Sequence, residues 1–170
     1  ANRMMREIIL RHDLVASDLG EGLRTAAAGL HRRCDELADF GVLPDEAEAC
    51  AAKRLAELGP GAEPGELALA GRFADEAKAY RLMLKERWSR GLLTYSDQLL
   101  LPLRLLRDMP GPASLVRGEF THVIVDEFQD CNPAQLAFLR RLAPAPGVGP
   151  RLCAVGDDDQ SIYGFRGADD

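Results

Sequence analysis

Hydrophobic residues in the N-terminal half of the chain recur at helical spacing. Leu30, Cys34 and Leu37 lie three or four residues apart, which places them on one face of a helix. A second apolar stripe starts after Pro44, a residue that suits the first turn of a helix, and a long third stripe follows the loop GPGAEPG. The pattern predicts a helical N-terminal subdomain over residues 1–90.

The hydrophobic pattern changes in the C-terminal part of the chain. HVIVDE (His122–Glu127) and RLCAVGD (Arg151–Asp157) contain short apolar runs without alternation, which is typical of strands covered on both faces. Between them, Asn132 and Pro133 provide an N-cap and a first helical residue. A strand, a helix and a strand of these lengths predict a βαβ unit with two parallel strands.

The segment between these two patterns carries its own signals. Ser96 is expected to cap a helix that runs to about Arg107, and the sequence PGP, Pro110–Pro112, is expected to break the chain. The change of pattern predicts a domain boundary near residues 90–95. The predicted fold class is therefore α/β, with a helical N-terminal subdomain followed by part of a parallel sheet with flanking helices.

Composition limits the class of protein and its compartment. The 170 residues are 46% hydrophobic and 28% charged, close to the average of soluble globular proteins. No apolar run approaches the ~20 residues that cross a bilayer, and charges interrupt the N-terminus too early for a signal peptide. The four cysteines are scattered without zinc spacing and are expected to be free thiols. We therefore expect a cytoplasmic protein without a membrane partner.

Negative charge gathers at the C-terminal end of the chain. The net charge is −6, and from Glu119 onward four arginines face nine acidic residues. Such a balance is not that of a nucleic-acid-binding domain held mainly by positive charge. It suggests instead a metal ion, or a metal ion brought in by a phosphate ligand.

Acidic residues follow both predicted strands. Asp126 and Glu127 end the first strand, and residues 157–160 (DDDQ) follow the second. Ligands of open parallel sheets bind beyond the carboxyl ends of the strands, so these groups are expected to converge. An aspartate there can hold Mg²⁺ and an adjacent glutamate can act as general base in nucleotide hydrolysis. Solvated surface acids remain the alternative.

Two long stretches resemble motifs of a known family. VDEFQDCNPAQ (Val125–Gln135) and VGDDDQSIYGFRGAD (Val155–Asp169) resemble motifs II and III of superfamily 1 DNA helicases of the UvrD/Rep/PcrA type. GLLTYSDQLL (Gly91–Leu100) resembles the helix that precedes motif II in that family, although Tyr95 and Ser96 replace two of its usual residues. The resemblance covers about the last 80 residues.

The resemblance implies both a fold and an activity. Residues 91–170 would be the C-terminal half of the RecA-like P-loop NTPase domain 1A, and residues 1–90 a helical 1B-like insertion. The parent protein would be an ATP-dependent helicase or translocase that moves 3′ to 5′, with ATP and Mg²⁺ as cofactors. Its partners would be single-stranded DNA, junctions of single- and double-stranded DNA, and the remaining helicase domains of the parent chain.

The resemblance also implies a role for individual residues, according to their positions in the two motifs. Asp126 would coordinate Mg²⁺, and Glu127 would be the hydrolytic base. Gln129 and Asp130 complete motif II at the nucleotide, where Asp130 would mainly orient its neighbours. Gln160 would contact the γ-phosphate and the attacking water.

Three residues of the second motif would face DNA. Tyr163, Phe165 and Arg166 would contact single-stranded DNA, and Phe165 stands where relatives often carry tryptophan. An aromatic ring there can stack on a base, worth ~1–3 kcal/mol in a sequence-tolerant way. The alternative for both aromatic residues is a place in the core beside a glycine-rich turn.

One expected motif is absent from the sequence. A phosphate loop requires GxxxxGK[ST], but Lys53, Lys78 and Lys85 are the only lysines and none follows a glycine. The chain is therefore expected to be a piece of a longer protein and to be inactive in ATP hydrolysis by itself. Two alternatives stay open: the motor of an AddA/RecB-like helicase–nuclease subunit, and a degenerate helicase-like module that only binds DNA.

Overall fold

The computed structural model describes residues 2–14, 22–59, 61–157 and 159. The chain divides into two compact units. The first consists of Ala1–Leu37 and Val42–Leu93, and the second of Ala38–Gly41 and Thr94–Asp170. The identification of these units with 1B-like and 1A-like subdomains stays a prediction.

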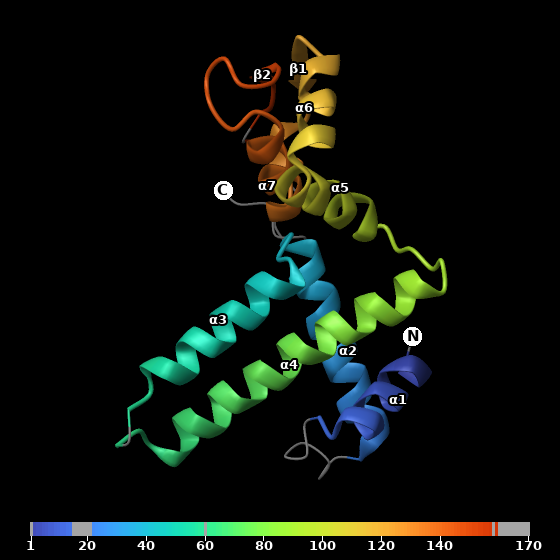
Figure 1. Ribbon diagram of the computed structural model, residues 1–170, viewed down its shortest axis with the longest axis vertical. Helices are drawn as coiled ribbons and strands as arrows, with labels where there is room; N and C mark the ends of the chain where they lie inside the picture. The colour runs from blue at the N-terminus through green and yellow to red at the C-terminus, as the bar shows by residue number, and fades with distance from the viewer. Residues whose placement is uncertain (1, 15–21, 60, 158, 160–170) are drawn as a thin grey trace. The chain divides into compact units, whose positions relative to one another are not determined.

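The first unit is helical over its described residues, as the apolar stripes predict. It contains α1 (Asn2–His12), most of α2 (Leu23–Asp39), α3 (Pro44–Glu57) and α4 (Pro64–Ser89). α3 and α4 lie side by side and run in opposite directions (Figure 1). None of the helices in the described ranges combines the length and the apolar character that crossing a membrane requires.

The core of the first unit forms where the apolar stripes of its helices meet. Its fully buried large side chains come from α1, α2, α4 and the residues beside the helices: Met5, Leu14, Leu30, Cys34, Leu43, Tyr80, Met83 and Leu84. The Tyr80 hydroxyl donates to the carbonyl oxygen of Val42 at 2.9 Å, so its polar group is satisfied inside the core. Pro44 begins α3 as predicted, and the Glu46 carboxylate accepts from the Leu43 N–H at 2.9 Å.

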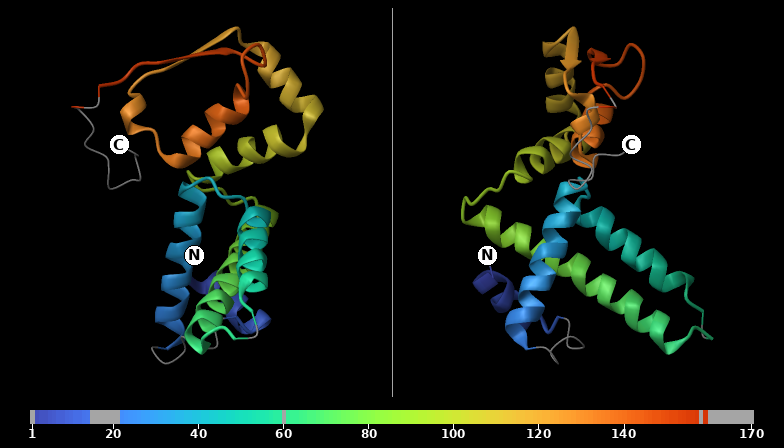
Figure 2. Two further views of the ribbon diagram at one scale, coloured as in Figure 1. Left: turned by 90° about the vertical axis from the view of Figure 1, so that its left-hand side faces the viewer. Right: turned by 180° about the vertical axis from the view of Figure 1, so that it is seen from behind.

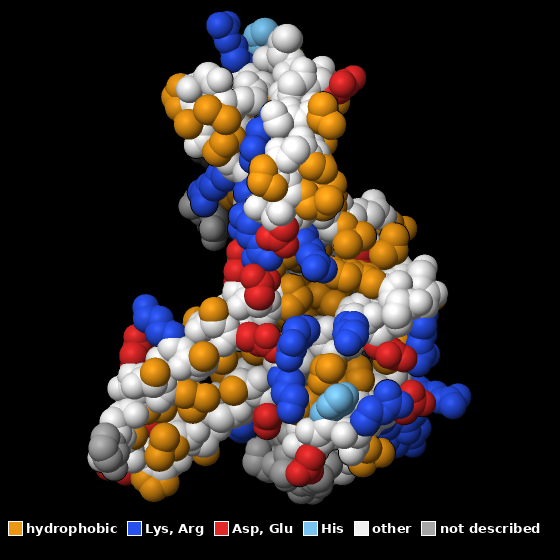
Figure 3. Space-filling view, in the orientation of Figure 1, with side chains coloured by type: hydrophobic (Ala, Val, Ile, Leu, Met, Phe, Trp, Pro, Cys, Tyr) orange, Lys and Arg blue, Asp and Glu red, His pale blue; other side chains and the backbone are white. Residues whose placement is uncertain are grey.

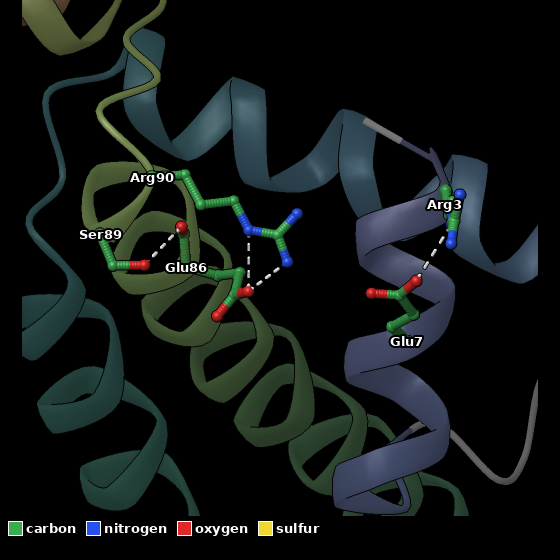
Figure 4. Close-up of polar contacts among 5 residues, drawn as sticks. All are labelled: Arg3, Glu7, Glu86, Ser89 and Arg90. Atoms are coloured by element: carbon green, nitrogen blue, oxygen red, sulfur yellow. Dashed lines mark hydrogen bonds and ion pairs between the residues drawn. The ribbon is translucent and has the colours of Figure 1, made fainter.

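Ion pairs lie on the surface of this unit, outside its core. Arg3 pairs with Glu7 on α1, and Arg90 pairs with Glu86 at the end of α4, where the Ser89 hydroxyl also donates to the Glu86 carbonyl oxygen (Figure 4). Exposed pairs four residues apart on a helix contribute only ~0.3–0.5 kcal/mol each. These two pairs therefore contribute little to the stability of the unit.

The second unit contains the predicted βαβ arrangement. Strand β1 (His122–Val125) is followed by α7 (Pro133–Leu142) and strand β2 (Arg151–Ala154), and the strands pair in parallel with Val123 opposite Leu152. The Asn132 side chain caps α7, as predicted, by accepting from the Gln135 N–H at 2.9 Å. The Gln135 side-chain oxygen in turn accepts from the Asn132 N–H at 2.8 Å, which completes a capping box.

Two further helices support this βαβ arrangement. Helix α5 (Asp97–Asp108) packs against α7 and against α6 (Pro110–Glu119), which leads into β1 (Figures 1 and 2). Leu106, Ala113 and Leu142 form a buried cluster among these helices, and Val123 of β1 packs on it. The helices thus pack against the Val123 side of β1.

Of two local predictions for this unit, one was confirmed in position and the other was wrong. Ser96 is the N-cap residue of α5, as predicted, but its hydroxyl donates to Asp39 and makes no cap bond, while Asp97 accepts from both the N–H and the hydroxyl of Thr94. The PGP sequence begins α6 rather than ending ordered structure, and the break is limited to Met109. Proline lacks only an N–H that a first helical residue would not use, so it suits this position.

The expectation of strands covered on both faces was also wrong. Ile124 is 72% exposed, and every residue of β2 is exposed, including Leu152 at 42%. Val123 faces the helices and is half-buried, whereas nothing in the described part of the chain covers the other face of the sheet. Hydrophobic side chains therefore reach the surface in this part of the unit (Figure 3).

Candidate functional site

The acidic ends of the two strands lie next to each other. The Val155 N–H donates to the Val125 carbonyl oxygen at 2.8 Å, and the Phe128 N–H donates to the Val155 carbonyl oxygen at 2.9 Å. These bonds continue the parallel pairing past both strands and into the turn that carries the paired acids. The structure therefore brings together the residues after β1 and the segment Gly156–Asp157, in agreement with the predicted convergence.

The turn after β1 gives Asp126 and Glu127 different backbone conformations. Glu127 has φ +50° and ψ +46°, a left-handed conformation that non-glycine residues adopt at a cost of about 1–2 kcal/mol. Asp126 Oδ1 accepts from the Glu127 N–H at 3.0 Å, and the Glu127 carbonyl oxygen accepts from the Asp130 N–H at 2.9 Å. The short 3-10 helix Phe128–Asp130 follows at once. These two hydrogen bonds thus stabilise the turn, while Asp126 and Glu127 both remain exposed.

Gln129 is the buried polar residue of the turn, with 9% of its surface exposed. Its amide nitrogen donates to Glu127 Oε2 at 2.6 Å, and its amide oxygen accepts from the Asp157 N–H at 3.0 Å. It therefore connects the acid after β1 with the backbone after β2. The family resemblance implied that Gln129 lies at the nucleotide. Neither of its two hydrogen bonds could have been predicted from the spacing of the motif.

Gly156 allows this close approach, a role that the sequence analysis did not assign. A Cβ atom at Gly156 would lie 2.5 Å from Gln129 Oε1 and 3.2 Å from the backbone nitrogens of Gln129 and Phe128. A side chain at this position would therefore force the Gln129 amide to shift. The only signal in the sequence was a glycine directly after an apolar strand.

The paired acids line a small hollow on the surface of the second unit. Asp126, Glu127 and Asp130 line this hollow of about 330 Å³ together with Gln135 and Phe138 of α7. Asp130 Oδ1 is buried and has no hydrogen-bond partner within the described ranges. Burial, followed by the negative charge of Asp130, raises the pKa of the neighbouring Cys131 thiol. The hollow thus contains three carboxylates and a protonated thiol, and none of its lining residues that the structure describes is positively charged.

The donor set fits a metal ion that arrives with a ligand better than a closed metal cage. Among the described residues, no three histidine, cysteine, aspartate or glutamate side chains are grouped so that they could hold a metal ion. Mg²⁺ in nucleotide sites needs only one or two carboxylates, because waters and phosphate oxygens complete its shell. The exposed carboxylate of Asp126 can supply one such ligand.

Four residues of the sequence-predicted site cannot be placed. Gln160, Tyr163, Phe165 and Arg166 lie outside the residues that the structure describes. Their proposed contacts with the γ-phosphate and with DNA stay predictions.

Comparison with known proteins identifies the family. The family model for the UvrD/REP helicase N-terminal domain matches residues 61–170, well over half of the chain. DNA helicase II of Escherichia coli (strain K12) is 45% identical over 78 residues, which are 46% of this chain and 10% of that protein. ATP-dependent DNA helicase UvrD1 of Mycobacterium tuberculosis (strain ATCC 25618 / H37Rv) is 44% identical over 80 residues, 45% of this chain and 10% of that protein.

A third relative is ATP-dependent DNA helicase PcrA of Staphylococcus epidermidis (strain ATCC 12228 / FDA PCI 1200), which is 39% identical over 77 residues, 45% of this chain and 10% of that protein. The chain thus matches about a tenth of the length of these relatives. The family match includes the paired acids, the bridging glutamine and both strands of the βαβ unit. The chain belongs to the UvrD/REP helicase N-terminal domain family.

Proposed function

We propose that this chain is part of the motor of an ATP-dependent DNA helicase or translocase, in which ATP is hydrolysed at the carboxyl ends of β1 and β2. The observation that carries the proposal is the position of Asp126 and Glu127 in one turn, beside the end of β2 and within the region of the family match. The 3′ to 5′ direction of movement follows from the family resemblance alone.

Asp126 and Glu127 would have separate tasks. Asp126 would provide a carboxylate to the Mg²⁺ that accompanies ATP, and this ion would draw negative charge from the phosphates. Glu127 would accept a proton from the attacking water. The left-handed backbone at Glu127 supports this division, because it turns the second carboxylate away from the direction that a continuing strand would give it.

The remaining motif residues complete the proposed motor. Asp130 would orient its neighbours in the hollow, and Gln160 would contact the γ-phosphate. Tyr163, Phe165 and Arg166 would meet single-stranded DNA, including its junctions with duplex. The phosphate loop and the other helicase domains would come from the rest of the parent protein, because this sequence contains no GxxxxGK[ST]. We therefore expect no ATP hydrolysis by the chain alone.

The test is Glu127→Gln in the full-length parent protein. The substitution keeps the size of the side chain but removes the base, so DNA-stimulated ATP hydrolysis should fall by ~10²-fold or more. Binding of a fluorescent ATP analogue should remain within a few-fold of wild type. Glu119→Gln is a matched control, because Glu119 is an exposed residue at the end of α6.

Two results would contradict the proposal. Normal turnover by Glu127→Gln would remove Glu127 as the base. A wild-type parent protein that binds single-stranded DNA but hydrolyses no ATP would favour the module that only binds DNA.

A further inference from the structure

The side chain of Gln129 is fixed at both ends of its amide group. Its nitrogen donates to Glu127 Oε2 at 2.6 Å and its oxygen accepts from the Asp157 N–H at 3.0 Å. An ionised carboxylate can only accept and a backbone N–H can only donate, so each partner alone requires the same orientation of the amide. The two ends of the amide are therefore not interchangeable.

The surroundings hold this amide in place. Gln129 is buried within the 3-10 helix, and the absence of a side chain at Gly156 lets its oxygen reach the backbone that follows β2. The Phe128 N–H bonds to the Val155 carbonyl oxygen at 2.9 Å, which fixes the backbone on the same side. A short hydrogen bond from a buried, immobile donor restricts the acceptor more strongly than a bond from a mobile surface group would.

The acceptor is the exposed end of a flexible residue. Glu127 has three side-chain torsions and would sample several rotamers at a surface turn. Catalysis by a general base depends on a narrow range of distance and direction to the water, and a misplacement of about 1 Å can reduce the rate ~10²-fold. A single carboxylate at such a position needs an orienting partner.

We propose that Gln129 is a positioning residue for the general base, because it holds one carboxylate oxygen of Glu127 and leaves the other free for the attacking water. This rests on the proposed function, in which Glu127 is that base. It also gives Gln129 a task different from the contact with nucleotide that motif position implied. The hydrogen bond from Asp157 anchors the amide and does not take part in the chemistry.

Two substitutions separate positioning from anchoring. Gln129→Met keeps the length and approximate volume of the side chain and loses both hydrogen bonds. Gln129→Glu keeps an oxygen that can accept from the Asp157 N–H, but it places a carboxylate where Glu127 needs a donor. If Gln129 orients Glu127, both variants should lower kcat by ~10-fold to ~100-fold, with KM for ATP nearly unchanged. If Gln129 only anchors the end of β2, Gln129→Glu should keep the wild-type kcat.

The experiment uses the full-length parent protein with saturating single-stranded DNA, and Gln98→Met is the matched control because Gln98 is an exposed glutamine of α5. Thermal unfolding checks that each variant is folded. Should Gln129→Met fail to fold, Gln129→Glu still decides between positioning and anchoring. Wild-type kcat in Gln129→Glu would overturn the proposal, as would a loss of ATP-analogue binding that accounts for the lower rate.

A double substitution distinguishes failure of this inference from failure of the proposed function. In the Glu127→Gln background, the addition of Gln129→Glu should cause no further loss of the residual rate, because the positioned group is already gone. A further loss of ~10-fold would show that Gln129 acts independently of Glu127, which overturns the inference while the proposed function stands. Normal hydrolysis by Glu127→Gln alone would overturn both.

Discussion

The backbone N–H of Asp157, three residues past β2, donates to the side-chain oxygen of Gln129, two residues past Glu127, at 3.0 Å. The ends of the two strands are therefore joined by a side chain as well as by backbone pairing. The arrangement depends on the absence of a side chain at Gly156, because a Cβ atom there would displace the Gln129 amide.

Gly156→Ala should disturb this contact. The added methyl group would meet Gln129 Oε1 at 2.5 Å, so the amide must move away from its place and release Glu127. We expect kcat for ATP in the parent protein to fall ~10-fold or more. Gly118→Ala, at a site in α6 with nothing within 4 Å of an added Cβ, is the control and should leave the rate unchanged. Equal rates in both variants would contradict the prediction.

Gly41→Ala should destabilise the second unit. Gly41 has φ +70°, and a Cβ there would lie 2.8 Å from the Cα of Ala134 at the start of α7. Strain and the clash with backbone should together lower the free energy of unfolding by about 1–3 kcal/mol, measured by urea unfolding.

The matched control for Gly41→Ala is Gly71→Ala in α4. An added Cβ at Gly71 meets nothing within 4 Å, and alanine is the better helix former, so a gain of about 0.5–1 kcal/mol is expected. Losses of the same size at both positions would show that the contact with Ala134 is unimportant.

Asp97→Ala should also destabilise the second unit. The Asp97 side chain is fully buried, and its Oδ2 accepts from the N–H of Thr94 at 2.7 Å and from the Thr94 hydroxyl at 2.9 Å. Losing two hydrogen bonds to a buried, charged acceptor should lower the free energy of unfolding by about 1–3 kcal/mol. Asp108→Ala, at the exposed end of the same helix, should have a much smaller effect in the same urea titration.

Cys34 should resist thiol reagents in the folded protein. Burial, followed by the negative charges of Asp35 and Glu76, raises the pKa of Cys34 to about 12, so the reactive thiolate is scarce at pH 8. Exposed Cys50 and Cys153 should react with iodoacetamide first, as measured by peptide mass spectrometry. Modification of all three at similar rates would contradict a buried Cys34.

The same pKa predicts how stability depends on pH. The Cys34 thiol loses its proton near the ordinary value of 9.0 in the unfolded chain and at about 12 in the folded one. Its contribution to stability is therefore complete below pH 9 and should be lost as the pH rises through this range. Cys34→Ala should flatten that part of the stability profile.

Local signals in the sequence predicted most of the helices and the order of the βαβ unit. Asn132 with Gln135, and Pro44 at the start of α3, are signals that involve only neighbouring residues, so they could be interpreted without tertiary structure. Pro110 was ambiguous, because proline ends one helix and begins another with equal ease.

The cover of the sheet and the geometry of the site could not be predicted in this way. Exposure of Ile124 depends on which segments pack over the strand, and that information is not in the apolar run itself. The contact between Gln129 and Gly156 joins residues far apart in sequence, and no local signal indicated the left-handed conformation of Glu127. The motif indicated candidate residues for the site, whereas their orientation depends on the folded structure.

The second unit is built from two separate segments of the chain, and this affects both its folding and its isolation from the first unit. It includes Ala38–Gly41 as well as Thr94–Asp170, and Gly41 lies against Ala134 although Val42–Leu93 of the first unit stands between them in the sequence. During synthesis this contact must wait until α7 has left the ribosome, and closing so long a loop slows folding. A protease cut between Leu93 and Thr94 would leave residues 38–41 attached to the other fragment. Domain dissection of this protein therefore needs an internal linker rather than a single cut.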